Sequence, residues 1–119
     1  MIKWSLLLIL LLIPITGFSE DVLEKAYDLN RQGMIDMSEA KFEEAVVLFQ
    51  EAAKLKSDYE ITGRPLLYTP IFMSAWAYEK IGDKKNACDA FRLFINRSGA
   101  SAESTKKDHA EHFIKNYCQ

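Results

Sequence analysis

The residues of this chain that are best suited to chemistry are its two histidines and two cysteines. His109 and His112 are three positions apart, so on a helix they share one face, with Asp108 and Glu111 beside them. Cys118 follows shortly after, and imidazole, thiolate and carboxylate groups all bind zinc. A structural zinc site uses four dedicated ligands, usually as two close pairs, and here the other cysteine would have to come across from another helix. We therefore expect surface histidines, with no metal and no cofactor.

Catalytic patterns are missing from the sequence. It contains no Ser/His/Asp arrangement, no pair of carboxylates in a pocket-forming context and no glycine-rich phosphate loop. We expect that the protein is not an enzyme. The alternative is an enzyme that uses His109, His112 and Asp108, and this alternative requires a bound metal.

The cysteines, Cys88 and Cys118, are the only two in the chain. In an exported protein, an even pair predicts one disulfide, with two free thiols as the alternative. Such a bond closes a loop of about 30 residues and stabilises the fold by roughly 3 to 4 kcal/mol. Because helical spacing continues almost to Cys118, the bond requires a bent or frayed C-terminus.

The first nineteen residues have the pattern of a secretory signal peptide. Lys3 precedes the unbroken apolar run SLLLILLLI, which is followed by a proline and by the ending Gly-Phe-Ser. A membrane span needs roughly 20 apolar residues, so this run is short for one. We predict a signal peptide over 1–19 with cleavage after Ser19; an uncleaved N-terminal anchor remains the alternative.

Composition indicates one compact domain over 20–119. Of the 119 residues, 49% are apolar and 27% are charged, as in globular proteins. Segment 1–19 contains one of the 15 basic residues and none of the 17 acidic ones, so the remainder has a formal charge of −3. This slight acidity gives no reason to expect nucleic acid as a partner. Membrane contact is expected only if the N-terminal segment is retained.

The periodicity of apolar residues indicates helices throughout the domain. Asp21 with Glu24 forms a capping box, Thr69 before Pro70 is typical of a helix start, and Gly82 of a helix end. No segment alternates as a strand does, so we predict an all-α fold. The helices are expected over 21–37, 40–56, 70–81, 84–96 and 102–117.

The first two helices and the next two share one register of small and large residues. A shift of 42 positions places Ala45 on Ala87 and superposes the other small and aromatic positions. Small side chains let helices approach closely, and the aromatic ring fills the space that this opens. The superposed pairs are Gly33 with Ala75, Ala45 with Ala87, and Phe49 with Phe91.

This register resembles the tetratricopeptide repeat (TPR), a helix-turn-helix unit of about 34 residues. The resemblance covers about 26–97, although Asp36 stands where the repeat has an aromatic residue and Phe94 where it has a small one. It implies two TPR-like hairpins in a right-handed α-solenoid, closed by a C-terminal capping helix with one apolar stripe. The segments are repeat one 26–57, insert 58–69, repeat two 70–97 and cap helix 102–117.

The resemblance also implies a concave binding groove lined by the first helix of each hairpin. Its expected contacts are rich in aromatic residues and methionine, which favours a peptide or helix as ligand. Acidic C-terminal peptides are not expected, because this chain lacks the lysine and asparagine that TPR chaperone adaptors use for them. The alternative is a groove covered by the cap helix or by the GRPLLY segment. The groove residues are Tyr27, Asn30, Met34, Met37, Thr69, Phe72, Trp76 and Glu79.

These observations predict an exported binding module, periplasmic or secreted, that holds a protein of a bacterial envelope complex. The bacterial assignment depends on the style of the signal segment and on the habit of the TPR family. The competing interpretation is a structural subunit packed permanently in a larger assembly through its convex side, its ends or a retained N-terminal helix.

Overall fold

The computed structural model describes residues 18–58, 65–99 and 102–119. The predicted signal peptide lies outside these residues, apart from its last two. The described residues form five helices and no strand, which confirms the all-α fold class. None of these helices combines the length and the apolar character that crossing a membrane requires. The helices are α2 (Phe18–Ser38), α3 (Phe42–Asp58), α4 (Pro65–Ile81), α5 (Lys84–Ser98) and α6 (Ser104–Tyr117).

The start of α4 differs from the prediction. We placed it at Pro70, but the helix begins at Pro65 and Pro70 lies inside it. Pro65 occupies the first helical position, where a missing N–H costs no helical hydrogen bond. Pro70 follows only five residues later, so it removes one bond near the helix end, and its ring is fully buried. The predicted helix start at Pro70 is therefore wrong, because the earlier Pro65 also fits the first position of a helix. Of the predicted insert, 59–64 lies outside the described residues.

The turns that close the two hairpins are built alike. In the first, the backbone N–H of Lys41 donates to the carbonyl of Asp36 at 2.8 Å, and Ala40 has a φ of 60°. In the second, the N–H of Asp83 donates to the carbonyl of Tyr78 at 3.0 Å, and Gly82 has a φ of 89°. Each residue of the second turn lies 42 positions after its counterpart in the first. The shift found in the sequence therefore also relates the two turns.

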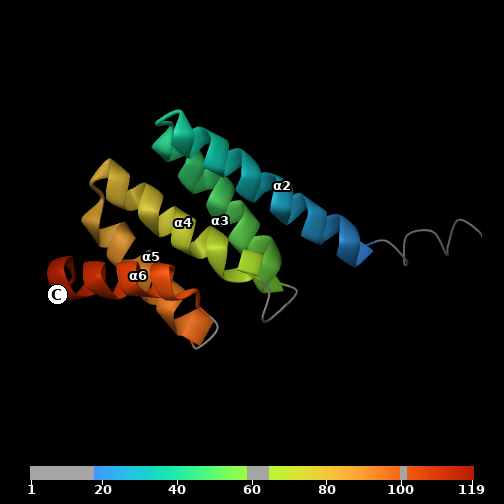
Figure 1. Cartoon of the computed structure of the whole chain (residues 1–119). Helices are drawn as coiled ribbons and strands as arrows, with labels where there is room; N and C mark the ends of the chain where they lie inside the picture. The colour runs from blue at the N-terminus through green and yellow to red at the C-terminus, as the bar shows by residue number, and fades with distance from the viewer. Residues whose placement is uncertain (1–17, 59–64, 100–101) are drawn as a thin grey trace, which may run out of the picture.

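Each helix packs mainly on the next one along the chain, and α2 also contacts α4 (Figure 1). Gly33 allows α2 to pack closely on α3. An added Cβ at this position would lie 2.6 Å from Cε1 of Phe49. The Phe49 ring is itself fully buried. The small residue and the large one therefore occupy one another's space, as the register predicts. The remaining small positions, Ala45, Ala52, Ala75 and Ala87, have no exposed surface.

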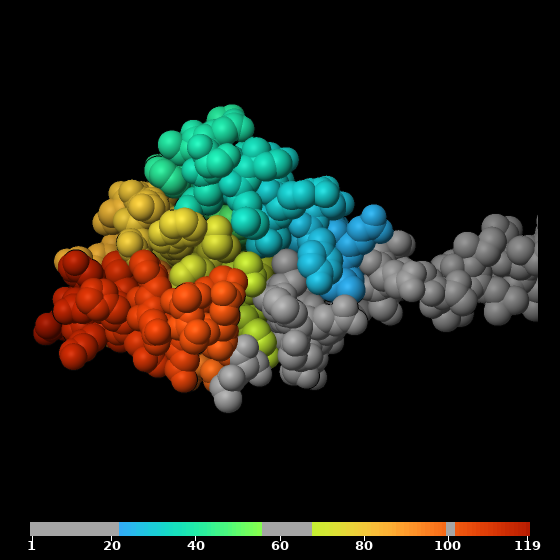
Figure 2. Space-filling view, in the orientation of Figure 1, coloured from blue at the N-terminus to red at the C-terminus, as the bar shows by residue number. Residues whose placement is uncertain are grey.

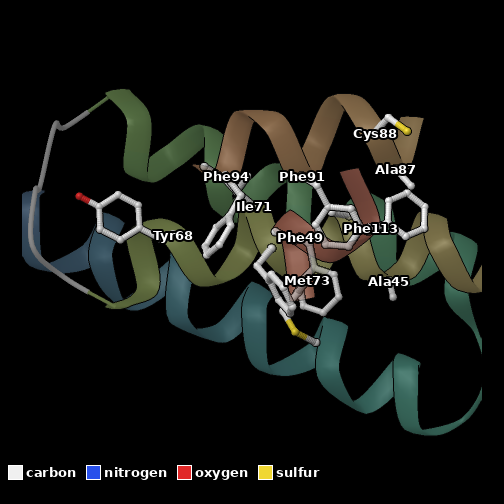
Figure 3. Packing of buried hydrophobic residues seen from close by; sticks show 13 residues of the cluster. Ala45, Phe49, Tyr68, Ile71, Met73, Ala87, Cys88, Phe91, Phe94 and Phe113 are labelled. Atoms are coloured by element: carbon white, nitrogen blue, oxygen red, sulfur yellow. The ribbon is translucent and has the colours of Figure 1, made fainter. Parts of the chain in front are cut away.

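The core continues from the hairpins into α6. The Phe72 ring lies edge-on to Phe91 and Phe94, with centroids 5.7 and 5.3 Å apart. Phe113 of α6 packs on Phe91 with centroids 4.9 Å apart, and Ala110 is fully buried beside it. All of these residues belong to one core cluster, in which Figure 3 labels Phe91, Phe94 and Phe113. The last helix therefore belongs to the core, and its burial fixes it over the end of the second hairpin.

Candidate functional site

The α2 part of the predicted groove is a stripe that is partly open to solvent. At about 100° per residue, Tyr27, Asn30, Met34 and Met37 lie along one side of the helix. Tyr27 is 45% exposed and Met34 is 50% exposed. Asn30 is buried, and its amide donates a long hydrogen bond of 3.8 Å to the Met34 sulfur. Met37 is half-buried and packs against the core cluster. Of the four groove residues predicted on α2, Tyr27 and Met34 are therefore the ones that a partner can reach.

The α4 part is largely covered. Phe72 is only 7% exposed, because its ring is enclosed by the core and by His109 of α6, at a centroid distance of 5.8 Å. Glu79 accepts a 2.8 Å hydrogen bond from Nε2 of the same histidine. Trp76 remains half-buried, with the Lys80 ammonium 5.7 Å from its ring centroid. Of the α4 residues that we predicted as contacts, Trp76 offers the most apolar surface.

The hollow beside Trp76 is closed on one side by α6. It has a volume of about 290 Å³, and α4 provides Phe72 and Trp76 to its lining. The other lining residues are Thr105, Lys106 and His109. Figure 2 shows a strip of α4 exposed between α2 and α6 on this side of the molecule. Trp76 therefore lies at a hollow between α4 and α6, and Phe72 lines the same hollow but is largely buried.

Polar contacts hold the beginning of α6 against α4. The Lys106 ammonium lies 3.1 Å from Oε2 of Glu103 and donates to the Thr69 hydroxyl at 3.4 Å. The hydrogen bond from Lys106 lowers the pKa of the Glu103 carboxyl, with a smaller effect from the Thr105 hydroxyl. Thr69, which we predicted as a groove residue, is therefore tied to α6.

A disulfide joins Cys88 to Cys118 and fastens the other end of α6. The Cα atoms are 5.8 Å apart, and the bond links the first turns of α5 to the end of the chain. Helix α6 ends at Tyr117, and Cys118 is extended, with a φ of −110° and a ψ of 125°. This is the C-terminal bend that the pairing requires. Disulfides persist in oxidising compartments, so the pair indicates a location outside the cytoplasm.

The two histidines, His109 and His112, have different surroundings. His109 faces α4 and bonds to Glu79, whereas His112 is exposed and its ring lies 3.2 Å from the Asn116 amide. Within the described ranges, the structure holds no group of three or more His, Cys, Asp or Glu side chains placed to bind a metal ion. Both cysteines are already used in the disulfide.

Sequence reasoning missed several residues around the hollow. Lys80 follows Trp76 by four positions, a spacing that brings side chains together on a helix. The contact between these two residues could therefore have been predicted from the sequence. Lys106 and His109 have no such signal, because they reach α4 only through the tertiary packing of α6. A comparison of the chain with protein-family models, with curated proteins and with solved structures finds no match.

Proposed function

We propose that this chain is an exported, TPR-like binding module that holds a peptide or helix of an envelope protein. The proposed contact surface, the inner face, consists of Tyr27, Met34 and Met37 of α2 together with Trp76 and Lys80 of α4. The observation that carries the proposal is the half-buried Trp76 beside a hollow of about 290 Å³, together with the exposed Tyr27 and Met34 of the α2 stripe.

Two features support the TPR-like part of the proposal. Gly33 accommodates the Phe49 ring as the small-and-large register requires, and the equivalent positions of the second hairpin, Ala75 and Phe91, are fully buried. The two turns also repeat one hydrogen-bond pattern at the shift of 42. A helical array of this kind binds ligands along the surface formed by successive first helices, which here are α2 and α4.

The side chains of the inner face favour a polypeptide ligand. Aromatic residues provide large contact area at low entropic cost, and methionine adapts to irregular apolar surfaces. Four of the five members are aromatic or methionine, and two of these, Tyr27 and Met34, are exposed, while the buried Asn30 and Phe72 are left out of the proposed contacts. Glu79 is left out as well, since its carboxylate is occupied by His109.

Export is supported from both ends of the chain. The disulfide indicates an oxidising compartment, and segment 1–19 has the charge and hydropathy pattern of a signal peptide. We propose a bacterial periplasm as the location. Intact-mass measurement of the native protein tests cleavage of the signal peptide. Cleavage leaves a chain beginning at Glu20, whereas a chain that keeps Met1 contradicts cleavage.

The burial of Phe72 under α6 favours a second candidate function. A cap that already fills part of the inner face suits a structural subunit that is packed permanently in a larger assembly by its other surfaces. The two functions differ in the role of Trp76. A structural subunit keeps its assembly when Trp76 is truncated, whereas a groove binder loses its ligand.

The proposal is tested by substituting inner-face residues in the native source. The double variant Met34→Ala with Trp76→Ala is affinity-purified beside wild type, and bound proteins are quantified by mass spectrometry. We expect at least about tenfold lower recovery of the principal partner, because truncating anchor residues costs on the order of 2 kcal/mol or more. Ile35→Ala is the matched control, since Ile35 is 44% exposed but lies next to Met34 on another side of α2. Unchanged recovery with the double variant contradicts the proposal.

A further inference from the structure

A second concave surface, the outer cleft, lies between α3 and α5 with α4 as its floor. Ser74 lies in this floor and Trp76 on the inner face, and two residues correspond to about 200° around a helix. The two surfaces are therefore on nearly opposite sides of α4. The outer cleft has a volume of about 360 Å³ and is lined by Gln50, Ala53, Lys54, Ile71, Ser74, Tyr78, Asn86, Asp89, Ala90, Leu93 and Arg97.

The middle of the outer cleft is apolar, and its sides are formed by small side chains. Ala53 of α3 and Ala90 of α5 form its sides, both half-buried, and Ile71 closes its floor with 3% of its surface exposed. Leu93 stands at the rim and is 42% exposed, although it is a large aliphatic residue. Alanine on both walls leaves the depth that one aliphatic side chain from outside can fill.

Charge is distributed along the outer cleft in one direction. Helices α3 and α5 both run antiparallel to α4, so Lys54 near the end of α3 and Arg97 at the end of α5 lie at the same end of the cleft. Lys54 makes no ion pair with any described residue. Asp89 is eight residues before Arg97, or about 12 Å along the helix axis. The cleft is therefore cationic at one end and acidic at the other.

The lining of the cleft also contains a polar group of fixed orientation, the hydroxyl of Tyr78. The Gln50 side-chain amide donates to the Tyr78 hydroxyl oxygen at 2.8 Å, so the hydroxyl accepts this bond and keeps its own proton to donate. A carbonyl or carboxylate oxygen lying along the cleft can accept that proton. The pattern of cation, hydroxyl donor and aliphatic surface is complementary to an acidic side chain next to an aliphatic one.

We propose that the outer cleft binds a segment of a second polypeptide in which an acidic side chain lies next to an aliphatic side chain. The acidic group is directed to Lys54, and the aliphatic group lies between Ala53 and Ala90. This interaction is separate from the proposed ligand of the inner face. With both surfaces in use, the chain is an adaptor that connects two partners on opposite sides of α4.

Selection from a random peptide library displayed on phage tests the proposal with the folded, disulfide-bonded chain as bait. Selected peptides are then measured against Lys54→Glu, against Trp76→Ala and against Arg92→Glu. Arg92 is the matched control for Lys54, because it is an exposed cation of α5 that does not line the outer cleft. Circular dichroism establishes that every variant is folded.

The expected result is a class of peptides that pair Asp or Glu with a neighbouring Leu, Ile or Val. Their affinity falls about tenfold or more with Lys54→Glu and stays within about twofold with Trp76→Ala and Arg92→Glu. The inference is overturned if every selected peptide is insensitive to Lys54→Glu, or if sensitive peptides lack acidic residues. If the selected peptides all depend on Trp76 and none on Lys54, the outer cleft is overturned and the inner face is left standing.

Discussion

The contact between Gly33 and Phe49 allows the interlocking of α2 and α3 to be tested quantitatively. An added Cβ at Gly33 would lie 2.6 Å from Cε1 of Phe49 and 2.9 Å from Cδ1 and Cζ. The ring is fully buried. Overpacking of this kind costs about 2 kcal/mol, within a general range of about 1 to 3. Alanine also recovers about 1 kcal/mol of helix propensity relative to glycine. Gly33→Ala is therefore expected to lower the free energy of unfolding by about 1 kcal/mol.

A double-mutant cycle separates the steric effect from helix propensity. In a Phe49→Leu background, the ring atoms nearest to the new methyl group are gone, so only the propensity gain remains. Gly33→Ala is then expected to raise the free energy of unfolding by about 1 kcal/mol, which gives a coupling energy of about 2 kcal/mol. Urea denaturation followed by circular dichroism measures all four proteins. If Gly33→Ala stabilises the wild-type background as much as the Phe49→Leu background, the two helices do not interlock at this contact.

Other predictions address the turn, the disulfide and the start of α6. Ala40→Gly is expected to raise the free energy of unfolding by about 1 kcal/mol, because Ala40 has a φ of 60°; a lower stability in urea denaturation contradicts this. Replacing Cys88 and Cys118 together by serine is expected to cost roughly 3.5 kcal/mol for a sequence separation of 30, and an unchanged midpoint in the same assay refutes it. Lys106→Met is expected to raise the depressed pKa of Glu103 toward its ordinary value in an NMR pH titration, while the Thr105 hydroxyl keeps part of the lowering. Since that pKa is lowered in the fold, its contribution to stability is lost as the pH falls through it, and an unchanged pKa in the variant excludes Lys106 as the cause.

Much of the fold could be predicted because it depends on local rules. Helix periodicity and the shift of 42 located the helices and the turn at Gly82, whereas two predicted cap residues, Asp21 and Thr69, lie inside α2 and α4. The start of α4 could not be fixed in this way. Pro65 and Pro70 both satisfy the rule for a helical first turn, and this local rule does not decide between them.

The candidate site was less predictable because it depends on where α6 lies. The sequence indicated a cap helix but not the side of α4 that it covers, so Phe72 was assigned to the surface although its ring lies in the core. The bond between His109 and Glu79 joins residues 30 positions apart and has no local signature. Trp76 and Met34 were assigned from the repeat register alone, and the exposure of Trp76 depends on the gap that α6 leaves.

Site-specific photo-cross-linking in the native source tests the binding role of the inner face most directly. A photoreactive phenylalanine analogue is placed at position 76, at position 34 and, as a control, at position 35. The account predicts that positions 34 and 76 form a covalent adduct with one and the same protein, and that position 35 forms little or none. An adduct from position 35 that equals those from 34 and 76, or no adduct from either inner-face position, contradicts it.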